Sequence, residues 1–458
     1  METICAISTP YGVGGIAVVR VSGEQAITVV DRLFHGRTAL ADTAADTVRH
    51  GYIEREGETL DEVLCSVFRA PHSFTGEDTV EIACHGSLYI QQTLLQWLVD
   101  AGCRMAKPGE FTQRAFLGGK MDLVQAEAVA DLIAAQSKAE KDLALSQLRG
   151  SVSNELSRLR ERLLEFTSLV ELELDFADHE ELEFADRSQL TALSDEIEQK
   201  LASLMSSFRT GNAIRNGIPV AIIGAPNVGK STLLNALLGE QRAIVSDIQG
   251  TTRDTVEDTL VLDGILFRLI DTAGLRETND VVESLGIERS RKAAAEAAVI
   301  IRVNEPKAYP QERFYDRPQD AQSGDALHPE GKGVVIEVLN KCDLLENGVS
   351  LQGETNGSRL AISAKLGEIE PLKRELVRVA RETMQTSAVM LSNARHYEAV
   401  SRAHEAIRRV QEGLANQLSG ELLSLDLQDC LKALGEVTGQ VTSQEVLNNI
   451  FSKFCIGK

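Results

Sequence analysis

The sequence is poor in aromatic residues and in basic residues, and the two shortages bear on the composition of its cores and on its partners. Aromatics make up 4% of the 458 residues, with one tryptophan, so we expect cores of aliphatic side chains and a lean toward helices. Lysine and arginine number 47 against 68 acidic residues, a formal net charge of −21. Proteins that coat nucleic acid without sequence preference are usually basic. Because salt screens electrostatic repulsion beyond about 8–10 Å, the negative net charge still allows a local basic patch to bind RNA.

The sequence also lacks C-x-x-C pairs and long apolar runs. Without C-x-x-C spacing, a zinc ribbon or a thioredoxin-type site is disfavoured. The seven cysteines are an odd number in a chain long enough to bury a core, which favours reduced thiols. No run reaches the about 18 apolar residues of a membrane-spanning helix, and the first residues do not resemble a secretory signal. These absences predict a cytoplasmic protein with no membrane segment.

The length suggests about three domains, and the first is α+β. Residues 1–118 contain short β-branched runs, such as residues 16–21, separated by turn residues. The glycines within residues 12–17 imitate a dinucleotide-binding fingerprint. That fingerprint must open a helix, whereas these glycines lead into a strand pattern, so we reject a dinucleotide site here.

Two segments with helical periodicity flank a central block. Apolar residues repeat at spacings of three and four in both segments; they are Leu156, Leu159, Leu163, Phe166 and Val170 in the first, and Val400, Ala403, Ile407, Val410 and Leu414 in the second. We therefore predict one discontinuous all-α domain made of residues 119–215 and 384–458. A third domain, residues 216–383, is inserted between them. It alternates strand and helix patterns, with a hairpin signal at Asp263-Gly264.

Residues 224–231 of the inserted domain have the pattern G-x-x-x-x-G-K-S between an apolar strand and a helix. This is the context of a phosphate-binding loop, in which glycines let backbone amides turn toward phosphates at a helix N-terminus. Lys230 is expected to reach the β and γ phosphates of a nucleotide, and Ser231 to bind magnesium. The other residues that we assign to GTP here are Asn227, Val228, Gly229 and Thr232.

Three further motifs follow in order, each at the end of a predicted strand. Residues 271–274, Asp-Thr-Ala-Gly, can hold magnesium through water and sense the γ-phosphate. Asp343, in an Asn-Lys-x-Asp motif, can accept two hydrogen bonds from guanine, a donor pair that adenine lacks. Ser363-Ala364-Lys365, after the next predicted strand, suits a contact with guanine O6. Together the motifs predict a Ras-like P-loop GTPase domain and a multidomain α/β chain. The residues assigned to GTP are Asp271, Thr272, Ala273, Gly274, Asn340, Lys341, Asp343, Ser363, Ala364 and Lys365.

The groups that would hydrolyse GTP are less clearly marked in the sequence. Thr252, in Gly-Thr-Thr-Arg-Asp at residues 250–254, is assigned as a second magnesium ligand, the alternative being an ordinary threonine-rich loop. Leu275 stands where Ras-like enzymes carry a water-orienting glutamine. An arginine (Arg253 or Arg276), a monovalent cation or Glu283 could replace it. From spacing alone, Glu283 is more typical of a solvated helix start.

Over essentially its whole length the sequence resembles the MnmE/TrmE family of tRNA-modification GTPases. Besides the GTPase motifs, the resemblance rests on residues 73–78 (SFTGED), 107–111 (KPGEF) and, most diagnostically, 454–458 (FCIGK). It implies that residues 1–118 bind 5-formyltetrahydrofolate and dimerise the protein. By similarity, the folate ligands are Arg20, Glu81 and Lys120, with Lys458 reaching the same pocket. From the sequence alone, Arg20 would be an ordinary strand-end arginine.

The resemblance also implies a GTPase activated by potassium. Asn227 would bind potassium through its side chain, and the potassium would act like an arginine finger as two GTPase domains meet. The family assigns the water-orienting role to the position of Glu283. The adjoining loop would contribute further potassium ligands, Ser246, Ile248 and Thr251, and further GTP contacts, Asp247, Gln249 and Gly250.

Members of this family work with an FAD-containing partner, MnmG/GidA, in a heterotetramer. Together they add an aminomethyl or carboxymethylaminomethyl group to C5 of the wobble uridine, position 34, of certain tRNAs. Cys455 is proposed for chemistry in the family, although the sequence shows no neighbouring base that would stabilise its thiolate.

A regulatory GTPase switch in ribosome assembly, without modification chemistry, is the alternative function. The GTPase motifs do not separate the two. The first domain and the terminal Cys-Ile-Gly-Lys favour the enzyme, since a ribosome switch would be expected to carry a basic RNA-binding module. A scaffold with an inactive nucleotide pocket is disfavoured by the intact Lys230, Ser231, Thr252 and Asp271.

Overall fold

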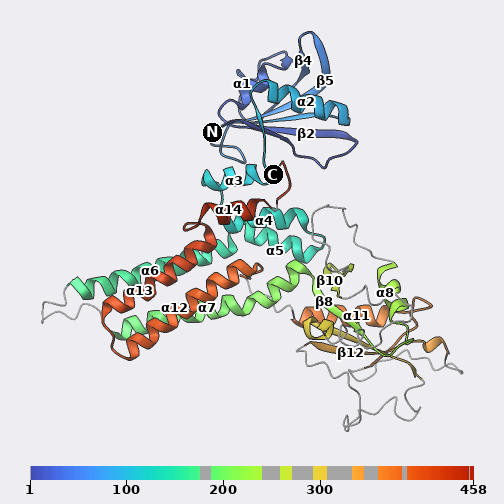
Figure 1. The fold of residues 1–458 in the computed structure, drawn as a ribbon, viewed down its shortest axis with the longest axis vertical. Coiled ribbons are helices and arrows are strands. Elements are labelled where there is room, and N and C mark those ends of the chain that lie inside the picture. Colours follow the sequence, from blue (N-terminus) through green and yellow to red (C-terminus); the bar gives the residue numbers. More distant parts are fainter. Residues whose placement is uncertain are drawn as a thin grey trace, which may run out of the picture. The chain divides into compact units, whose positions relative to one another are not determined.

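The structure is a computed structural model that describes residues 2–175, 187–239, 258–270, 292–306, 333–344, 359–383, 389–452 and 454–457 (Figure 1). The chain divides into two compact units. The first combines Met1–Ala130, Gln147–Ser194 and Glu405–Lys458, and the second combines Asp131–Ser146 and Asp195–His404. Each unit contains helices and a mixed sheet, so the fold is of the predicted multidomain α/β class.

The first unit is built on a seven-stranded sheet in the order β3-β4-β5-β6-β2-β1-β7. Neighbouring strands are antiparallel, except that β1 and β7 are parallel. The glycines of residues 12–15 lead into β2, a strand, as predicted. The strands are β1 (Ile4–Ile7), β2 (Gly14–Ser22), β3 (Phe34–Gly36), β4 (Thr47–Arg55), β5 (Glu58–Phe68), β6 (Thr79–Gly86) and β7 (Arg104–Met105).

The two faces of this sheet differ in what covers them. Helices α1 (Ala26–Asp31) and α2 (Leu88–Asp100) share one core with inward-facing strand residues such as Val19 and Ile82. Because side chains alternate along a strand, Ile4 and Ala6 of β1 point to the other face, where they pack with Phe111 of α3 (Glu110–Leu117). On that face Arg20 of β2 and Glu81 of β6 are half-buried, whereas Ser22 and Thr79 at the end of the strand pair are buried.

Long helices carry the predicted apolar stripes. Both stripes named above are buried at every position, and α6 packs along α13 as the first stripe requires. Amphipathic helices gain most of their stability from burying such a face. The helices within residues 119–215 and 384–458 are α4 (Leu123–Ala134), α5 (Lys138–Leu148), α6 (Ser151–Asp175), α7 (Arg187–Asn216), α12 (Ala394–Ala415), α13 (Gly420–Thr438) and α14 (Gln444–Phe451).

The second unit is built on a six-stranded sheet in the order β13-β12-β11-β8-β10-β9. All neighbours are parallel except β9 and β10, which form the predicted hairpin around Asp263 and Gly264. Both turn residues have positive φ, 49° and 75°, as the tightest hairpin turns require. The strands are β8 (Ile218–Ile223), β9 (Asp258–Leu262), β10 (Ile265–Leu269), β11 (Val299–Asn304), β12 (Val334–Leu339) and β13 (Arg359–Ala361).

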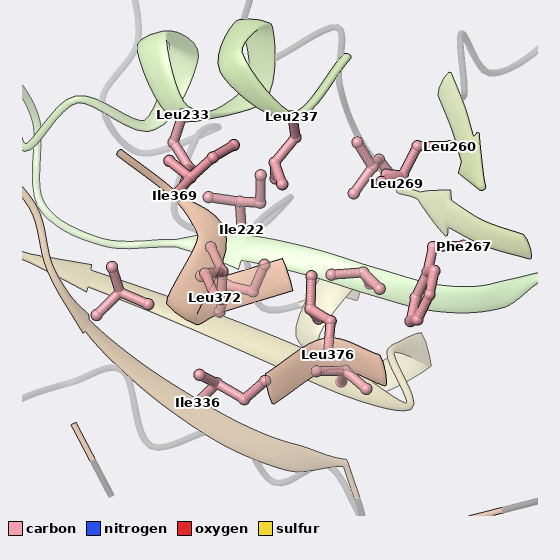
Figure 2. Close-up of a cluster of buried hydrophobic side chains, with 14 of the residues drawn as sticks. Ile222, Leu233, Leu237, Leu260, Phe267, Leu269, Ile336, Ile369, Leu372 and Leu376 are labelled. Atoms are coloured by element: carbon pink, nitrogen blue, oxygen red, sulfur yellow. The ribbon is translucent and has the colours of Figure 1, made fainter. Parts of the chain in front are cut away.

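The core of the second unit lies on both faces of β8. Figure 2 shows Leu233 and Leu237 of α8 (Lys230–Gly239) and Leu372 of α11 (Glu370–Thr383) gathered around Ile222. Ala221 and Ile223 belong to a smaller core on the opposite face. A strand buried on both faces is typical of the centre of a parallel sheet. This core fixes the carboxyl end of β8, where the phosphate-binding motif begins.

The seven cysteines are free thiols. Across the described ranges, none of the helices combines the length and the apolar character needed to cross a membrane.

Candidate functional site

The phosphate-binding motif forms the loop between β8 and α8, and its glycines stand where no side chain fits. A Cβ on Gly224 would lie 2.3 Å from the Val303 carbonyl oxygen, and one on Gly229 would lie 2.3 Å from Asn340 Nδ2. Gly229 also has a φ of +93°, and Asn227 one of +65°. Positive φ values turn successive amides toward one side of a loop, which makes an anion-binding concavity.

Lys230 opens α8 and folds back over this loop. Its Nζ donates to the carbonyl oxygens of Gly224 at 2.9 Å and Ala225 at 2.8 Å. Burial lowers the pKa of Lys230 from its ordinary value. The ammonium is therefore held by neutral carbonyl groups, which phosphate oxygens can replace with a stronger, charge-assisted interaction.

A single buried amide, that of Asn340, joins three of the predicted motifs. Its Nδ2 donates to the Val228 carbonyl at 2.9 Å, and its Oδ1 accepts from the Ala364 N–H at 3.0 Å. Asn340 is 2% exposed, so losing either partner would leave a buried polar atom unsatisfied. The loops that follow β8, β12 and β13 thus meet at one edge of the sheet, as parallel strands allow.

Lys341 makes a second link to the phosphate-binding loop. Its Nζ donates to the Asn227 carbonyl at 2.5 Å and pairs with Glu305, which follows β11. Glu305 belongs to none of the motifs found in the sequence. A lone acidic residue after a strand carries no motif, and its position beside Lys341 arises only from the pairing of β11 with β12.

The predicted guanine-reading residues also lie together. Ser363 is buried, and its Oγ donates to Asp343 Oδ1 at 2.7 Å. Asp343 itself is exposed, as is Lys365. A carboxylate anchored through one oxygen and exposed to solvent can accept hydrogen bonds from a base.

Ser231 and Thr232 occupy the first turn of α8, next to Lys230. Ser231 is half-buried there, and a hydroxyl oxygen suits a hard cation such as magnesium. The other assigned residues of the GTP, magnesium and potassium sites lie outside the described residues; they are Ser246, Asp247, Ile248, Gln249, Gly250, Thr251, Thr252, Asp271, Thr272, Ala273, Gly274 and Glu283.

In the first unit, Arg20 lies between aromatic rings and a carboxylate rather than in solvent. It pairs across β2 and β6 with Glu81, with Nε and Nη2 at 2.9 and 2.7 Å from Glu81 Oε1. Its guanidinium carbon lies 5.4 Å from the centre of the Phe74 ring and 5.6 Å from that of Phe111. Arg20 therefore lies inside β2, two residues before its end, and is half-buried in an ion pair. Lys120 donates to the Pro71 carbonyl at 2.9 Å, close in sequence to Phe74.

The C-terminal tail lies against the same sheet. Ser8 Oγ donates to the Gly457 carbonyl at 3.2 Å, and the Gly109 N–H donates to the Cys455 carbonyl at 3.4 Å. Gly457 has a φ of +95°, and a Cβ there would lie 2.1 Å from the Ile7 carbonyl, so no other residue fits. The tail thus reaches the end of β1, the strand that pairs with β2. Cys455 is exposed, and Lys458 lies outside the described residues.

Comparison with known proteins gives matches over most of the chain. The family model described as the MnmE helical domain matches residues 123–455, and that of the GTP-binding protein TrmE N-terminus matches residues 3–120. Two relatives named tRNA modification GTPase MnmE come from Parabacteroides distasonis and Bacteroides thetaiotaomicron. They are 54% and 50% identical to this chain over all of its length and over 100% and 99% of theirs.

Solved structures give a weaker likeness. The G domain of the T. maritima FeoB iron transporter is 24% identical and covers 36% of this chain and 98% of its own, with a TM-score of 0.24. A TM-score this low carries no argument about function.

Proposed function

The chain belongs to the MnmE family of tRNA modification GTPases, and from this premise we propose how its GTP hydrolysis serves tRNA modification. With an FAD-containing partner of the MnmG/GidA type, it adds an aminomethyl or carboxymethylaminomethyl group to C5 of uridine 34 of certain tRNAs. The observation that carries the GTPase part is the meeting of three nucleotide motifs around the buried side chain of Asn340. Its place of action is the cytoplasm.

We assign three domains to the chain. Residues 1–118 bind folate and dimerise, residues 119–215 and 384–458 form the helical domain, and residues 216–383 form the GTPase domain. The end of α7 at Asn216 and the end of α11 at Thr383 support the boundaries of the inserted domain.

In the nucleotide site, Lys230 exchanges its two carbonyl partners for the β and γ phosphate oxygens of GTP. Ser231 and Thr252 bind magnesium, which neutralises charge that develops on the transferred phosphoryl group. Asp343 accepts from guanine, while Ser363 holds its other oxygen. The remaining assigned residues of the four motifs surround the nucleotide.

Potassium completes the site at Asn227, with Ser246, Ile248 and Thr251 as further oxygen ligands. Bound there, potassium would supply positive charge to the phosphates, as an arginine finger does in other GTPases. Glu283 orients the attacking water in place of the glutamine that Leu275 replaces. We expect Glu283→Ala to keep nucleotide affinity and to slow turnover, and turnover equal to that of the wild type would refute this role.

The first domain binds 5-formyltetrahydrofolate through Arg20, Glu81, Lys120 and Lys458. A guanidinium suits the glutamate tail of a folate, and a carboxylate suits the donor edge of its pterin ring. Cys455, which is exposed on the neighbouring tail, is proposed to take part in the modification chemistry. That chemistry itself belongs to the folate and to the FAD of the partner.

A second copy of the chain covers the face of the seven-stranded sheet that lies opposite α1 and α2. Exposed apolar side chains lie on that face of β2, β4 and β5, and an exposed apolar patch of this kind commonly marks an interface. They are Ile16, Val48, Tyr52 and Leu64. The same face carries Arg20 and Glu81, so dimerisation and folate binding are neighbours.

GTP turnover of the pure protein in potassium and in sodium buffer, at equal ionic strength, tests this function. A large gain in potassium supports Asn227 as a cation ligand. Equal rates would remove the potassium site and require an arginine or a partner as activator. Calorimetry with 5-formyltetrahydrofolate tests the first domain separately and distinguishes the modification enzyme from a GTPase switch.

A further inference from the structure

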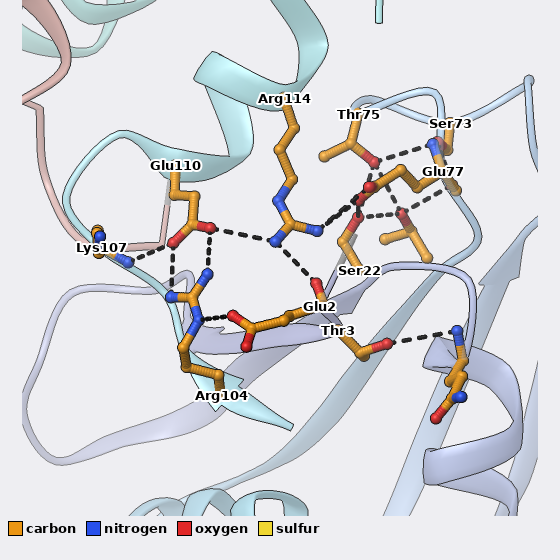
Figure 3. Close-up of polar contacts among 12 residues, drawn as sticks. Glu2, Thr3, Ser22, Ser73, Thr75, Glu77, Arg104, Lys107, Glu110 and Arg114 are labelled. Carbon is orange, nitrogen blue, oxygen red and sulfur yellow. Dashed lines mark hydrogen bonds and ion pairs between the residues drawn. The ribbon is translucent and has the colours of Figure 1, made fainter. Parts of the chain in front are cut away.

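Arg114 lies at the centre of a buried network of charges in the first unit (Figure 3). Its side chain is 5% exposed. The guanidinium donates to both carboxylate oxygens of Glu77, at 3.2 and 3.0 Å, to Glu110 Oε1 at 3.1 Å and to the Glu2 carbonyl at 2.8 Å. A buried charge is tolerated only when its hydrogen-bonding groups are satisfied in this way.

Glu77 transmits this constraint to residues 71–77, hereafter the 71–77 loop, which lies between β5 and β6. Glu77 Oε2 accepts from Ser22 Oγ at 2.9 Å. The Glu77 N–H donates to Thr75 Oγ1 at 3.2 Å, and the Glu77 carbonyl accepts from Ser73 Oγ at 2.6 Å. The bonds that orient Glu77 therefore also orient the residue between Ser73 and Thr75, which is Phe74.

Arg114 also belongs to α3, the helix that carries Phe111. Phe74 and Phe111 are the two rings within 5.6 Å of the Arg20 guanidinium carbon. Arg114 reaches the surroundings of Arg20 through Glu77, which is bonded to Ser22 of β2 and belongs to the 71–77 loop, and through its own helix α3.

We propose that Arg114 is a positioning residue for the folate pocket: by joining Glu77 to α3, it fixes Phe74 and Phe111 around Arg20. The guanidinium of Arg20 is then held with Glu81 in the geometry that binds the ligand. This inference rests on the proposed folate site. In this proposal, residues 73–78 and α3 together orient the two aromatic rings that lie around Arg20.

Arg104 provides a matched control. Like Arg114, it is an arginine bound to Glu110, with Nη2 2.6 Å from Glu110 Oε1 and Nη1 3.1 Å from Oε2. Its other partners, the Glu2 carboxylate and the Met105 carbonyl, lie away from the 71–77 loop. Removing Arg104 leaves Glu77 bound to Arg114, and it leaves Glu110 bound to Arg114 and to the Lys107 N–H.

The experiment compares the full-length wild type with Arg114→Met/Glu77→Met and with Arg104→Met. The double variant removes the buried guanidinium together with its half-buried carboxylate partner, a paired change that is often tolerated, and it leaves Glu110 bound to Arg104. Calorimetry with 5-formyltetrahydrofolate should give a Kd about tenfold higher for the double variant, the scale on which loss of pre-organised side chains lowers affinity. Arg104→Met should bind like the wild type. Ser22→Ala, which loses one bond to Glu77, should give a smaller rise in the same direction.

A double-mutant cycle that adds Phe74→Ala to the double variant separates a positioning role of Arg114 from general destabilisation of the domain. If Arg114 acts through Phe74, the loss caused by the double variant should largely disappear in the Phe74→Ala background, because coupled residues are not additive. Amide exchange should also quicken in residues 73–78 of the double variant and stay unchanged in Arg104→Met. Wild-type affinity in both the double variant and Ser22→Ala, or full additivity with Phe74→Ala, would overturn the proposal. Wild-type protein that fails to bind folate would refute the folate site itself.

Discussion

The two sheets of this chain place their polar groups in different ways. In the second unit, they stand in loops at the carboxyl edge of a parallel sheet, and most of the contacts use the backbone. In the first unit, they stand in the middle of antiparallel strands, and the contacts join side chains such as Arg20 and Glu81. A backbone loop keeps its shape when its side chains change, whereas a pocket of side chains depends on everything that packs behind them.

The charges of the two sites are also held differently. Lys230 rests on two neutral carbonyl groups, so its positive charge is available to an anion. Arg20 already has a carboxylate partner in Glu81, and Arg114 has two, Glu77 and Glu110. The lysine of the second unit therefore has no carboxylate among these partners and can pair with a phosphate. The two arginines of the first unit are already paired with carboxylates of the same unit.

Lys230→Ala should have the largest effect and should separate the two sites most clearly. Removing one pre-organised charge from a reacting group costs about 10²–10³-fold in rate, and we expect GTP turnover to fall by that factor. Folate affinity, which the proposed site assigns to the other sheet, should stay at the wild-type value. A parallel loss of folate binding would show that the two sheets are not independent. Turnover and calorimetry on the same preparation measure both.

Asp343→Asn should have the next largest effect, because it changes one side chain of the nucleotide site and leaves its loops in place. Hydrogen bonds to a charged group contribute about 1.5–3 kcal/mol, so GTP affinity should fall roughly 10- to 100-fold. Xanthosine triphosphate should bind better than to the wild type, since its 2-oxo group accepts where guanine donates. Unchanged preference for GTP in a competition assay would remove Asp343 from base recognition.

The difference between loops at strand ends and pockets of side chains explains which features the sequence could predict. The phosphate-binding loop, the guanine-reading motif and the hairpin at Asp263 each depend on a few consecutive residues, and each lies at the strand end or turn that the sequence predicts. The buried stripes of α6 and α12 followed from helical periodicity in the same way.

The first site could not be predicted from local pattern. Arg20, Phe74, Glu81 and Phe111 are separated along the chain and meet only through the pairing of β2 with β6 and the packing of α3. Arg20 and Glu81 entered through resemblance to a family. Arg114 did not enter at all, because a lone arginine on a short helix gives no signal until its partners are known. The residue Glu305 was missed for the same reason.

Glu110→Gln should give the smallest effect, one that depends on pH and is confined to the first unit. Burial opposes ionisation of Glu110, but bonds from Arg104, the Lys107 N–H and Arg114 outweigh it and lower its pKa from 4.5 to about 2. A full shift of this size corresponds to about 3 kcal/mol. Since Arg104 is 36% exposed and water screens its contribution, we expect roughly 1–2 kcal/mol.

The sign of this effect follows from the lowered pKa. Glu110 is ionised at lower pH in the folded than in the unfolded chain, so its stabilisation is complete above about pH 4.5 and is lost as the pH falls toward 2. Trp97 of α2, the single tryptophan, reports urea unfolding of the first unit by fluorescence. The difference between wild type and Glu110→Gln should be full at pH 7 and shrink below pH 4.5. Glu375→Gln, which breaks a surface pair on α11, should leave this transition unchanged. A difference that persists at low pH would mean that Glu110 stabilises α3 by packing rather than by charge, and the buried network would then lose its electrostatic basis.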